Sequence, residues 1–341
     1  VAGGAFGALS AGATTNDATP TLTFTAEAGS TVNVYDGTTL LGTATEGPSG
    51  TFTYTPSTLA DGPHTFSATA ADAAGNTSAP TAGFVLIVDT IAPSQPSVAV
   101  PEGPVVNHSE ELSNGGTPVV TSLPVDAQVG DTVTTIVTPP NGGTPITLTT
   151  VLTLSDIQRG NISQLITTAQ LTAAPDGNWT TSTTITDTAG NVSPAATGGF
   201  SVDTTVTVGS GALTAVAGND SGSLGDNLTN DSTPAVSGVT EPNAAVSVVI
   251  NGQTYTTTAN SSGAWSVTAA NLSDGTYTPV ITVTDPEGNT ATANGTPFTV
   301  DTTPPAAPVV TNQTATSLLP TISGTAVVGI GETLTVVVNG A

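Results

Sequence analysis

Short runs in which apolar and polar side chains alternate extend along most of this chain. In its first part they cover residues 20–25, 31–35, 51–54 and 64–68, and residues 84–88 form a more continuous apolar run. Alternation with a period of two is typical of β-strands that bury one face. Segments rich in Gly, Pro, Asp and Ser separate the runs, as turns require. The pattern predicts short antiparallel strands joined by tight turns.

The same arrangement returns later in the chain, with runs at residues 246–250, 264–267, 277–284 and 297–300. About seven short strands in about 100 residues, with a turn every 8–12 residues, describe a Greek-key β-sandwich. No amphipathic segment has the length of an ordinary helix, and residues 154–159 are predicted as one short helical turn. We therefore expect an all-β fold.

A motif with fixed internal spacing occurs three times. It begins with Asp-Gly, and a residue with a ring side chain (His, Trp or Tyr) follows three residues after the Asp. A second Asp comes eleven residues after the first, and a Gly-Asn pair and a Val-Asp-Thr segment follow it. Its main members are Asp61, His64, Asp72, Asn76 and Asp89, then Asp176, Trp179, Asp187, Asn191 and Asp203, then Asp274, Tyr277, Asp285, Asn289 and Asp301. Such a repeat indicates an array of similar modules, which favours a stalk or scaffold over an enzyme.

The motif divides the chain into tandem modules. Residues 1–89, 90–203 and 204–301 are each about the size of one sandwich domain, and residues 302–341 correspond to the N-terminal part of a fourth, incomplete module. The second module is longer than its neighbours between Pro118 and Asp176. This predicts an insertion around residues 138–167.

Composition narrows the possible partners. The 341 residues carry 25 Asp and Glu against a single Arg, Arg159, and no Lys, for a formal net charge of −24. Nucleic acids and anionic membranes would be repelled, so contact with either is not expected. The absence of Cys excludes disulfides and thiol chemistry, and no apolar run approaches the roughly 20 residues that span a bilayer. Because the chain starts without Met or a leader, we expect an internal or processed segment.

Salt bridges cannot neutralise these acids, because one Arg cannot pair with 25 carboxylates. Two carboxylates about 4 Å apart repel by roughly 4 kcal/mol at an effective dielectric constant near 20. If the acids cluster, a cation has to come from solvent.

The linkers and loops carry a family resemblance. Residues 88–93 (Val-Asp-Thr-Ile-Ala-Pro) and 300–305 (Val-Asp-Thr-Thr-Pro-Pro) resemble the linkers between bacterial immunoglobulin-like (Ig-like) domains, as do the loops at 186–191 and 230–234. Such domains form the repetitive regions of giant, type I-secreted, biofilm-associated (RTX-type) adhesins of Gram-negative bacteria. The resemblance implies tandem Ig-like sandwiches in an extended rod. It implies a calcium-rigidified extender between a cell anchor and a distal binding tip.

Topology predicts where the acids meet. The Asp that ends the last strand of one module should lie against loops of the next module, at the pole where the chain enters. This places Asp89 near Asp126 and Asp187, Asp203 near Glu241, Asp285 and Glu287, and Asp301 near Glu332. Together with Asn191 or Asn289 and backbone carbonyls, these acids offer the hard oxygen ligands that Ca²⁺ prefers. The alternative is that Asp and Asn form turns through their side-chain hydrogen bonds.

A second set of candidate calcium ligands lies at the pole where the chain leaves each module, with Asp17 beside Asp61 and Asp231 beside Asp274. The third module adds Asp220 and Asp226 in an acid-rich loop that matches no helix-loop-helix calcium motif. Turn formation explains this set about as well.

Catalysis is not expected. The two histidines are His64 and His108, and His64 stands where the other modules have Trp179 and Tyr277. It is therefore predicted as a packed strand residue, and no Ser or Thr has an evident His and carboxylate to activate it. Paired carboxylates also occur in glycosidases, but these enzymes need a cleft that distorts a sugar.

Two alternatives to the stalk stay open. One is a carbohydrate-binding module that uses the insertion, although residues 138–167 contain no aromatic side chain. The other is a self-assembling matrix filament, in which another subunit completes the fourth module. For the stalk, the expected partners are neighbouring modules of the same chain and like chains in a biofilm matrix. The expected location is extracellular, at the bacterial surface.

Overall fold

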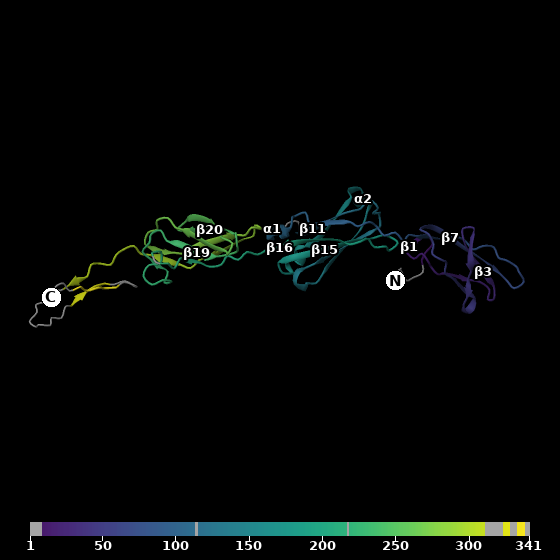
Figure 1. The fold of residues 1–341 in the computed structure, drawn as a ribbon, viewed down its shortest axis with the longest axis horizontal. Helices are drawn as coiled ribbons and strands as arrows, with labels where there is room; N and C mark the ends of the chain where they lie inside the picture. Colours follow the sequence, from purple (N-terminus) through teal and green to yellow (C-terminus); the bar gives the residue numbers. More distant parts are fainter. Residues whose placement is uncertain (1–8, 113–114, 217, 311–322, 328–332, 338–341) are drawn as a thin grey trace, which may run out of the picture. The chain divides into compact units, whose positions relative to one another are not determined.

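The computed structural model of the chain describes residues 9–112, 115–216, 218–310, 323–327 and 333–337. Strands dominate these residues (Figure 1), which confirms the predicted all-β class. Contacts divide the chain into two compact units, one with residues 1–106 and 110–202 and the other with residues 107–109 and 203–341. In the described part of the chain, no helix has the length and apolar character needed to span a bilayer.

The first module contains two sheets. One has the strand order β1-β8-β7-β3-β4, with β1 parallel to β8, and the other has the order β2-β6-β5. The strands are β1 (Ala13–Thr15), β2 (Leu22–Thr25), β3 (Thr31–Asp36), β4 (Thr39–Thr43), β5 (Thr45–Glu46), β6 (Thr51–Tyr54), β7 (Gly62–Ala71) and β8 (Phe84–Val88).

Alternation in the sequence becomes alternation of burial. In β3, Val32 and Val34 are buried while the residues between and around them are more exposed, and Val34 pairs with Ala68 of β7. Phe52 and Phe66 are each 1% exposed and belong to the same apolar core. Fully burying a side chain of this kind contributes about 1.5–3 kcal/mol. The core between the two sheets therefore stabilises the sandwich.

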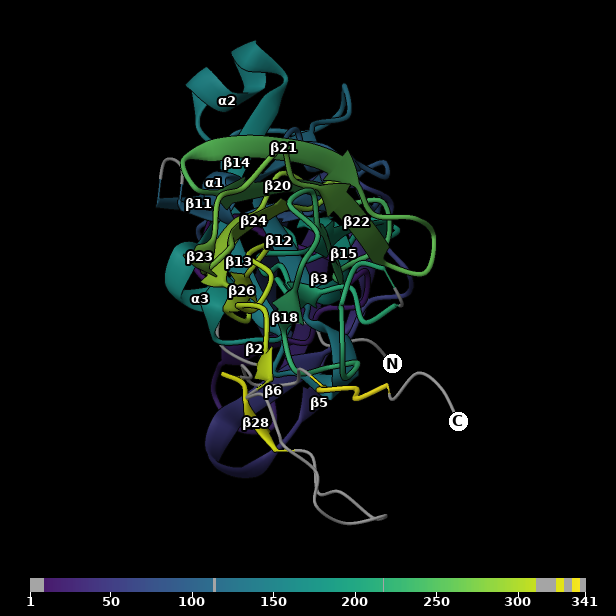
Figure 2. The ribbon, with the colours of Figure 1, turned by 90° about the vertical axis from the view of Figure 1, so that its left-hand side faces the viewer.

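The second module repeats this arrangement with sheets of order β10-β16-β15-β12-β13 and β14-β11-β9. Its elements are β9 (Ser97–Ala99), β10 (Val105–Val106), α1 (His108–Leu112), β11 (Gly116–Ser122), β12 (Thr132–Thr138), β13 (Ile146–Val151), α2 (Leu154–Arg159), β14 (Asn161–Thr167), α3 (Thr168–Thr172), β15 (Gly177–Thr186) and β16 (Ala196–Val202). The helical turn predicted at residues 154–159 is confirmed as α2, which projects beside the strands in Figures 1 and 2.

The additional residues of the second module do not form one separate loop. Residues 139–145 join β12 to β13, where residues 37–38 suffice in the first module. Helix α2 lies between β13 and β14, and α3 follows β14. The extra length is thus spread over several connections of the sandwich.

The third module has sheets of order β17-β19-β22, β18-β26-β23 and β21-β20-β24-β25. In Figure 2, β21, β20 and β24 lie side by side. The strands are β17 (Gly211–Leu213), β18 (Leu228–Thr229), β19 (Ala235–Val239), β20 (Ala245–Ile250), β21 (Gln253–Thr258), β22 (Ala264–Thr268), β23 (Gly275–Tyr277), β24 (Val280–Thr284), β25 (Thr290–Asn294) and β26 (Phe298–Val300). Further on, β27 (Val309–Val310) pairs with β28 (Gly324–Thr325).

Small residues make room for the largest ring of the third module. Trp265 of β22 is 4% exposed, and its indole lies over Gly211 and Gly238. A Cβ atom at either glycine would come within 2.8 Å of the Trp265 ring. Phe52 has the same place in β6 of the first module and pairs there with Phe24. The third module therefore fills this position with one large ring over two glycines, and the first module fills it with two phenylalanines.

The Asp-Gly motif needs glycine for its backbone. Gly62, Gly177 and Gly275 have φ angles of 132°, 139° and 153°, in a region that side chains with a Cβ atom rarely enter. The strand with the motif ring begins at each of these glycines. Glycine is thus required for the turn into that strand.

The ring of the motif ties this turn to the strand that follows. The Tyr277 hydroxyl donates a hydrogen bond to the Ser273 carbonyl at 2.8 Å, and His64 Nε2 lies 2.9 Å from the Ala60 carbonyl. Both carbonyls are four residues upstream, as in the tyrosine corner of Ig-like sandwiches. The ring of Trp179 stacks on Phe200, with centroids 5.8 Å apart. His64 stacks on Phe66, which confirms that it is a packed residue.

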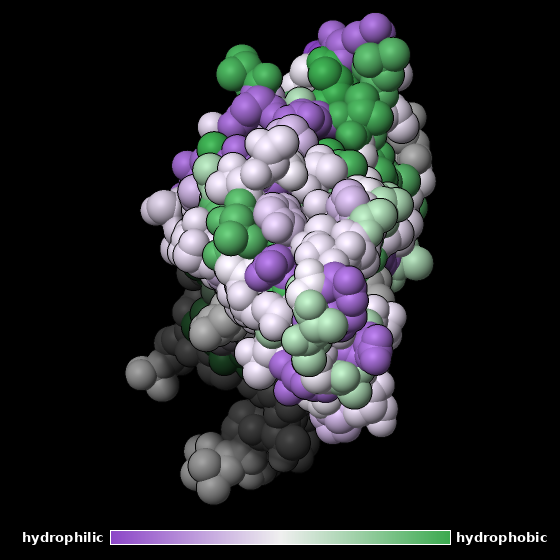
Figure 3. Space-filling model, turned by 90° about the vertical axis from the view of Figure 1, so that its right-hand side faces the viewer, coloured by the Kyte–Doolittle hydropathy of each residue, from purple (hydrophilic) through white to green (hydrophobic). Residues whose placement is uncertain are grey.

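The surface reflects the composition. Pale residues of intermediate hydropathy cover most of the face shown in Figure 3, with separate green and purple groups between them. Glycine alone contributes 38 of the 341 residues, and charged residues make up only 8%. On this face, small and neutral side chains therefore meet the solvent.

Candidate metal site

The Asp-x-x-Gly-Asn segment of each module forms a closed loop between strands. In the third module, Asp285 Oδ1 accepts a hydrogen bond from the Asn289 backbone N–H at 2.8 Å, and the Asn289 carbonyl accepts one from the Asp285 N–H at 3.0 Å. Gly288 has a φ of 98°, which glycine adopts without strain. The loop closes around the Asp carboxylate and fixes the direction of the Asn side chain.

That Asn side chain reaches the residue that ends the preceding module. Asn191 Nδ2 donates to the Asp89 carbonyl and to Asp187 Oδ2, both at 2.8 Å. Asn289 Nδ2 donates in the same way to the Asp203 carbonyl and to Asp285 Oδ2, again at 2.8 Å. Each amide thus holds the Asp of the Val-Asp-Thr linker (Asp89 or Asp203, the linker Asp) beside the first Asp of the loop (Asp187 or Asp285). The sequence prediction that Asp89 lies with Asp187, and Asp203 with Asp285, agrees with this geometry.

Three carboxylates converge in the second unit. One oxygen each of Asp203, Asp285 and Glu287 lies within 4.8 Å of the others. Asp285 is 5% exposed, so solvent screens its charge poorly. At an effective dielectric constant near 20, each such pair of charges repels by roughly 3–4 kcal/mol.

Backbone and amide contacts surround this group of three. Asn107 Nδ2 donates to the Glu287 carbonyl, and the His108 backbone N–H donates to Asn289 Oδ1, each at 2.8 Å. These contacts hold the loop of residues 285–289 in place. Glu241, which the topology placed near Asp203, accepts a hydrogen bond from the Thr207 N–H at 2.7 Å. It does not belong to the group of three.

The corresponding acids of the first unit do not converge within 4.8 Å of one another in the described part of the chain, but they include a residue that was not predicted from the sequence. Asp126 Oδ2 accepts a hydrogen bond from the Ser94 N–H at 2.9 Å. Asp131, 2% exposed, was not predicted as a ligand. Burial raises the pKa of its carboxyl, and the nearby charges of Asp187, Asp126 and Asp89 raise it further, against a hydrogen bond from Gln128. Asp131 is therefore close enough to the other three acids for their charges to disfavour its ionised form.

The acids at the opposite pole bind threonines. Asp61 Oδ1 accepts hydrogen bonds from both the N–H and the hydroxyl of Thr90 at 2.9 Å. Asp274 Oδ1 binds Thr302 in the same way, at 2.8 and 2.7 Å. These contacts join the Asp-Gly turn to the Val-Asp-Thr linker. They join residues 28 or 29 positions apart, so they are not the local turn contacts that the alternative explanation of these acids predicted.

The remaining predicted ligands have local contacts. Asp17 and Asp231 each accept a hydrogen bond at 2.8 Å from the N–H two residues later, and Asp226 accepts one from Leu228 at 3.0 Å. Asp301 Oδ1 accepts one from the Thr303 N–H at 3.1 Å. The predicted partner of Asp301, Glu332, lies outside the described residues.

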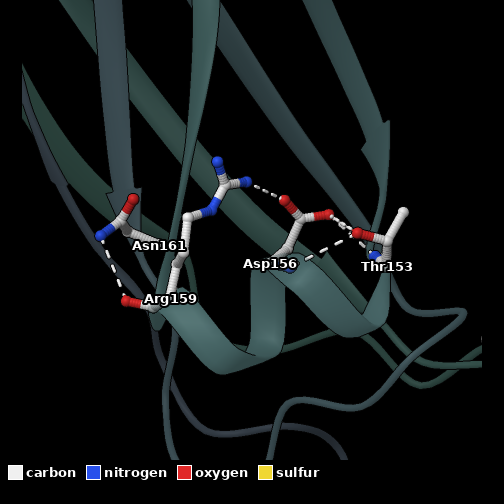
Figure 4. A network of polar contacts seen from close by, with 4 residues as sticks. All are labelled: Thr153, Asp156, Arg159 and Asn161. Carbon is white, nitrogen blue, oxygen red and sulfur yellow. Dashed lines mark hydrogen bonds and ion pairs between the residues drawn. The ribbon is translucent and has the colours of Figure 1, made fainter.

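The single Arg is engaged away from these acids. Arg159 at the C-terminal end of α2 pairs with the Asp156 carboxylate, as Figure 4 shows. Asp156 also accepts hydrogen bonds from the Thr153 hydroxyl and N–H, which form a capping box at the start of α2. These hydrogen bonds and Arg159 lower the pKa of Asp156. Since the chain has no Lys, no other Lys or Arg is present to balance the carboxylates near Asp89 and Asp203.

The donor set fits a hard divalent cation. Carboxylate oxygens with backbone and amide oxygens are the ligands of Ca²⁺, whereas Zn²⁺ and copper sites use His or Cys. The chain has no Cys and only two His. Asp203, Asp285 and Glu287 are the residues that would hold such an ion in the second unit.

Comparisons with known proteins give a family and several similar structures. The sequence profile of the bacterial Ig-like domain family matches residues 3–90 and 207–302. A structure of a 1.5-MDa bacterial ice-binding adhesin is similar over 83% of this chain and 90% of its own, with 24% identity and a TM-score of 0.37. A tetra-tandem repeat from the extending region of a large adhesion protein is similar over 86% of this chain and 74% of its own, with 25% identity and a TM-score of 0.29. No curated protein sequence matches this chain.

Proposed function

This chain belongs to the bacterial Ig-like domain family, and from that premise we propose that it is a structural extender segment of a secreted bacterial surface adhesin. In this proposal, calcium at the module junctions makes the linkers stiff. The segment supports adhesion and biofilm formation by holding a distal binding region away from the cell. Its partners are neighbouring Ig-like modules of the same chain, and its location is extracellular.

One observation carries the calcium part of the proposal. Asp203, Asp285 and Glu287 converge within 4.8 Å in a chain whose single Arg pairs with Asp156. The Asn289 side-chain amide donates to the Asp203 backbone carbonyl and to the Asp285 carboxylate, so it holds both residues at this group. A group of this kind is favourable when a cation occupies it.

The mechanism is mechanical. Asp203 directly follows the last strand of the second module, β16, whereas Asp285 and Glu287 belong to the loop after β24. An ion bound to all three fixes the backbone at residue 203 relative to the third module. Asp89 and Asp187 stand in the same relation in the first unit. Extracellular calcium modules bind at roughly 10⁻⁴–10⁻³ M, so these junctions would be filled outside the cell.

Small-angle scattering of the whole chain tests the proposal. It is measured with about 2 mM Ca²⁺, above the expected affinity range, and then with excess chelator, with calorimetric titration in parallel. We expect a longer and stiffer particle with calcium, an effect that chelator removes.

Two variants with the same change in charge make the test specific. The triple variant Asp89→Asn, Asp203→Asn, Asp301→Asn should lose the calcium response. The control Glu27→Gln, Glu46→Gln, Asp72→Asn alters three acids of the first module that are not among the candidate ligands and should keep it. Identical scattering profiles and no binding heat for the unaltered chain would refute the calcium mechanism. The matrix-filament and carbohydrate-binding functions would then become the better explanations.

A further inference from the structure

The connection between β17 and β18 contains a buried acid. Asp220 is 2% exposed. One of its carboxylate oxygens, Oδ2, accepts a hydrogen bond from the Gly225 N–H, so the group points into the loop of residues 221–228. Its other oxygen, Oδ1, is buried and has no hydrogen-bond partner among the described residues.

A carboxylate in this position needs a counter-charge or further donors. Burying an ionised group without a partner costs several kcal/mol. The adjacent Asn219 supplies none, because its Nδ2 donates to the carbonyls of Thr214 and Ala235, and its Oδ1 accepts from the Ala235 N–H. The single Arg of the chain binds Asp156.

The corresponding connection in the second module shows the same feature independently. Between β9 and β10 lies Glu102, whose Oε2 is buried and has no hydrogen-bond partner of good geometry among the described residues, although the Thr117 side chain lies close enough to favour the ionised carboxylate. Both connections pass from one sheet of the sandwich to the other. Two modules of different sequence therefore place a buried carboxylate oxygen at the same crossover.

We propose that the crossover loop of the third module binds a calcium ion inside that module, with Asp220 as the central ligand. In this proposal Asp226, the residue after Gly225, supplies the second carboxylate through its Oδ2, since its Oδ1 accepts a hydrogen bond from the Leu228 N–H. Oxygen ligands of this type select Ca²⁺ over softer metals. This ion is separate from the group formed by Asp203, Asp285 and Glu287. It joins β17 to β18 within one module and does not depend on the junction proposal.

Equilibrium dialysis with radioactive calcium, on the whole chain, tests this site by counting bound ions. The Asp220→Asn variant keeps an acceptor for the Gly225 N–H but loses the charge, and it should bind one ion fewer than the unaltered chain. The Asp203→Asn variant reports the junction separately, and the two losses should add. Glu46→Gln, an exposed acid of the first module, should change nothing.

Thermal unfolding in chelator gives a second measurement. Without calcium, Asp220→Asn should melt at the same temperature as the unaltered chain or higher, because an unpaired buried charge has been removed. If Asp220→Asn folds and binds as many ions as the unaltered chain, the site is wrong and buried water satisfies Asp220. If that variant does not fold, the Asp226→Asn variant, changed at an exposed position, is tested in its place. Weaker calcium binding by Asp226→Asn supports the site, and unchanged binding overturns it.

Discussion

The side-chain amide of Asn289 lies 2.8 Å from the backbone oxygen of Asp203, 86 residues earlier in the chain. The same amide donates to the Asp285 carboxylate, and its oxygen accepts from the His108 N–H. Asn191 binds Asp89 and Asp187 in the same manner. The Gly-Asn element of the repeat is therefore more than a turn. It presents a fixed amide that holds the linker Asp.

Replacing Asn289 by Ala should destabilise the loop that holds Asp203. The side chain is 5% exposed and takes part in three hydrogen bonds with the Asp203, Asp285 and His108 groups. At about 0.5–1.5 kcal/mol for each bond, a loss of roughly 2–4 kcal/mol is expected in the free energy of unfolding. Denaturant unfolding in chelator measures this loss without a contribution from bound calcium.

Asn76→Ala is the matched control for this experiment. Asn76 has the same loop contacts to Asp72 but is exposed to solvent. Its replacement should cost less than 1 kcal/mol, as is typical of exposed sites. Equal losses for Asn76→Ala and Asn289→Ala would mean that the contact to the linker Asp contributes nothing.

Removing the N-cap of α2 should weaken the helix that carries the single Arg. Thr153→Ala removes the hydroxyl that accepts a hydrogen bond from the Asp156 N–H in the capping box. Loss of such an N-cap side chain typically lowers the free energy of unfolding by about 1 kcal/mol. Arg159→Gln leaves the cap intact and removes an ion pair whose Arg side chain is 59% exposed, so its effect should be smaller. Urea unfolding of both variants checks this order. A larger loss for Arg159→Gln would contradict it.

The sequence predicts the strands well because their signal is local. Alternation over a few residues and Gly- or Asp-rich turns determine β3, β6 and β7 without reference to the rest of the molecule. Helices α1 and α3 were not predicted. Each has five residues, and contacts between segments support them, such as the hydrogen bond from the Thr168 hydroxyl to the Glu111 carbonyl. A pattern confined to a short window does not contain that information.

The site was predicted as far as the repeat extends. Asp187, Asn191, Asp285 and Asn289 share a motif, so their positions follow from one another. Asp131 was missed because it stands outside the motif, before β12, and its burial depends on segments distant in sequence. Binding of Asp61 to Thr90, 29 residues later, could not be distinguished from calcium binding, since both uses require an exposed carboxylate next to a turn.

The stability of the first module should decrease as the pH rises through neutrality, because of His64. Its Nδ1 lies 2.6 Å from Asp36 Oδ2 and its Nε2 lies 2.9 Å from the Ala60 carbonyl, so the protonated ring can donate to both. Burial alone would lower the pKa of His64, but the hydrogen bonds to Ala60 and Asp36 outweigh it and raise the pKa above 6.5. The extra stability is full below pH 6.5 and disappears as the pH passes the raised value.

His64→Tyr should remove this pH dependence and keep the fold, because Tyr277 has the same place in the third module and binds a carbonyl four residues upstream. Melting temperatures between about pH 5.5 and 8.5 should fall for the unaltered chain and stay constant for the variant. Asp36→Asn should give a smaller decrease. A pH dependence that persists in His64→Tyr would show that another group is responsible.

Asp131→Asn should stabilise the chain when calcium is absent and weaken its response when calcium is present. Burial and the charges of Asp187, Asp126 and Asp89 raise the pKa of Asp131, so the folded state binds its proton more tightly than the unfolded state does. The unfolding free energy therefore falls as the pH rises from the unfolded value of about 3.9 through the raised value, and it stays lower above that. In chelator at pH 7 the Asp131→Asn variant should have a higher melting temperature than the unaltered chain, and below pH 4 the difference should vanish.

Asp126→Asn is the control, and its melting temperature should change in the opposite direction. Hydrogen bonds from Ser94 lower the pKa of Asp126, so that variant should be less stable than the unaltered chain at pH 7. If both variants shift the melting temperature in the same direction in chelator, the repulsion between Asp131 and the neighbouring acids does not limit stability, and calcium does not act by relieving it.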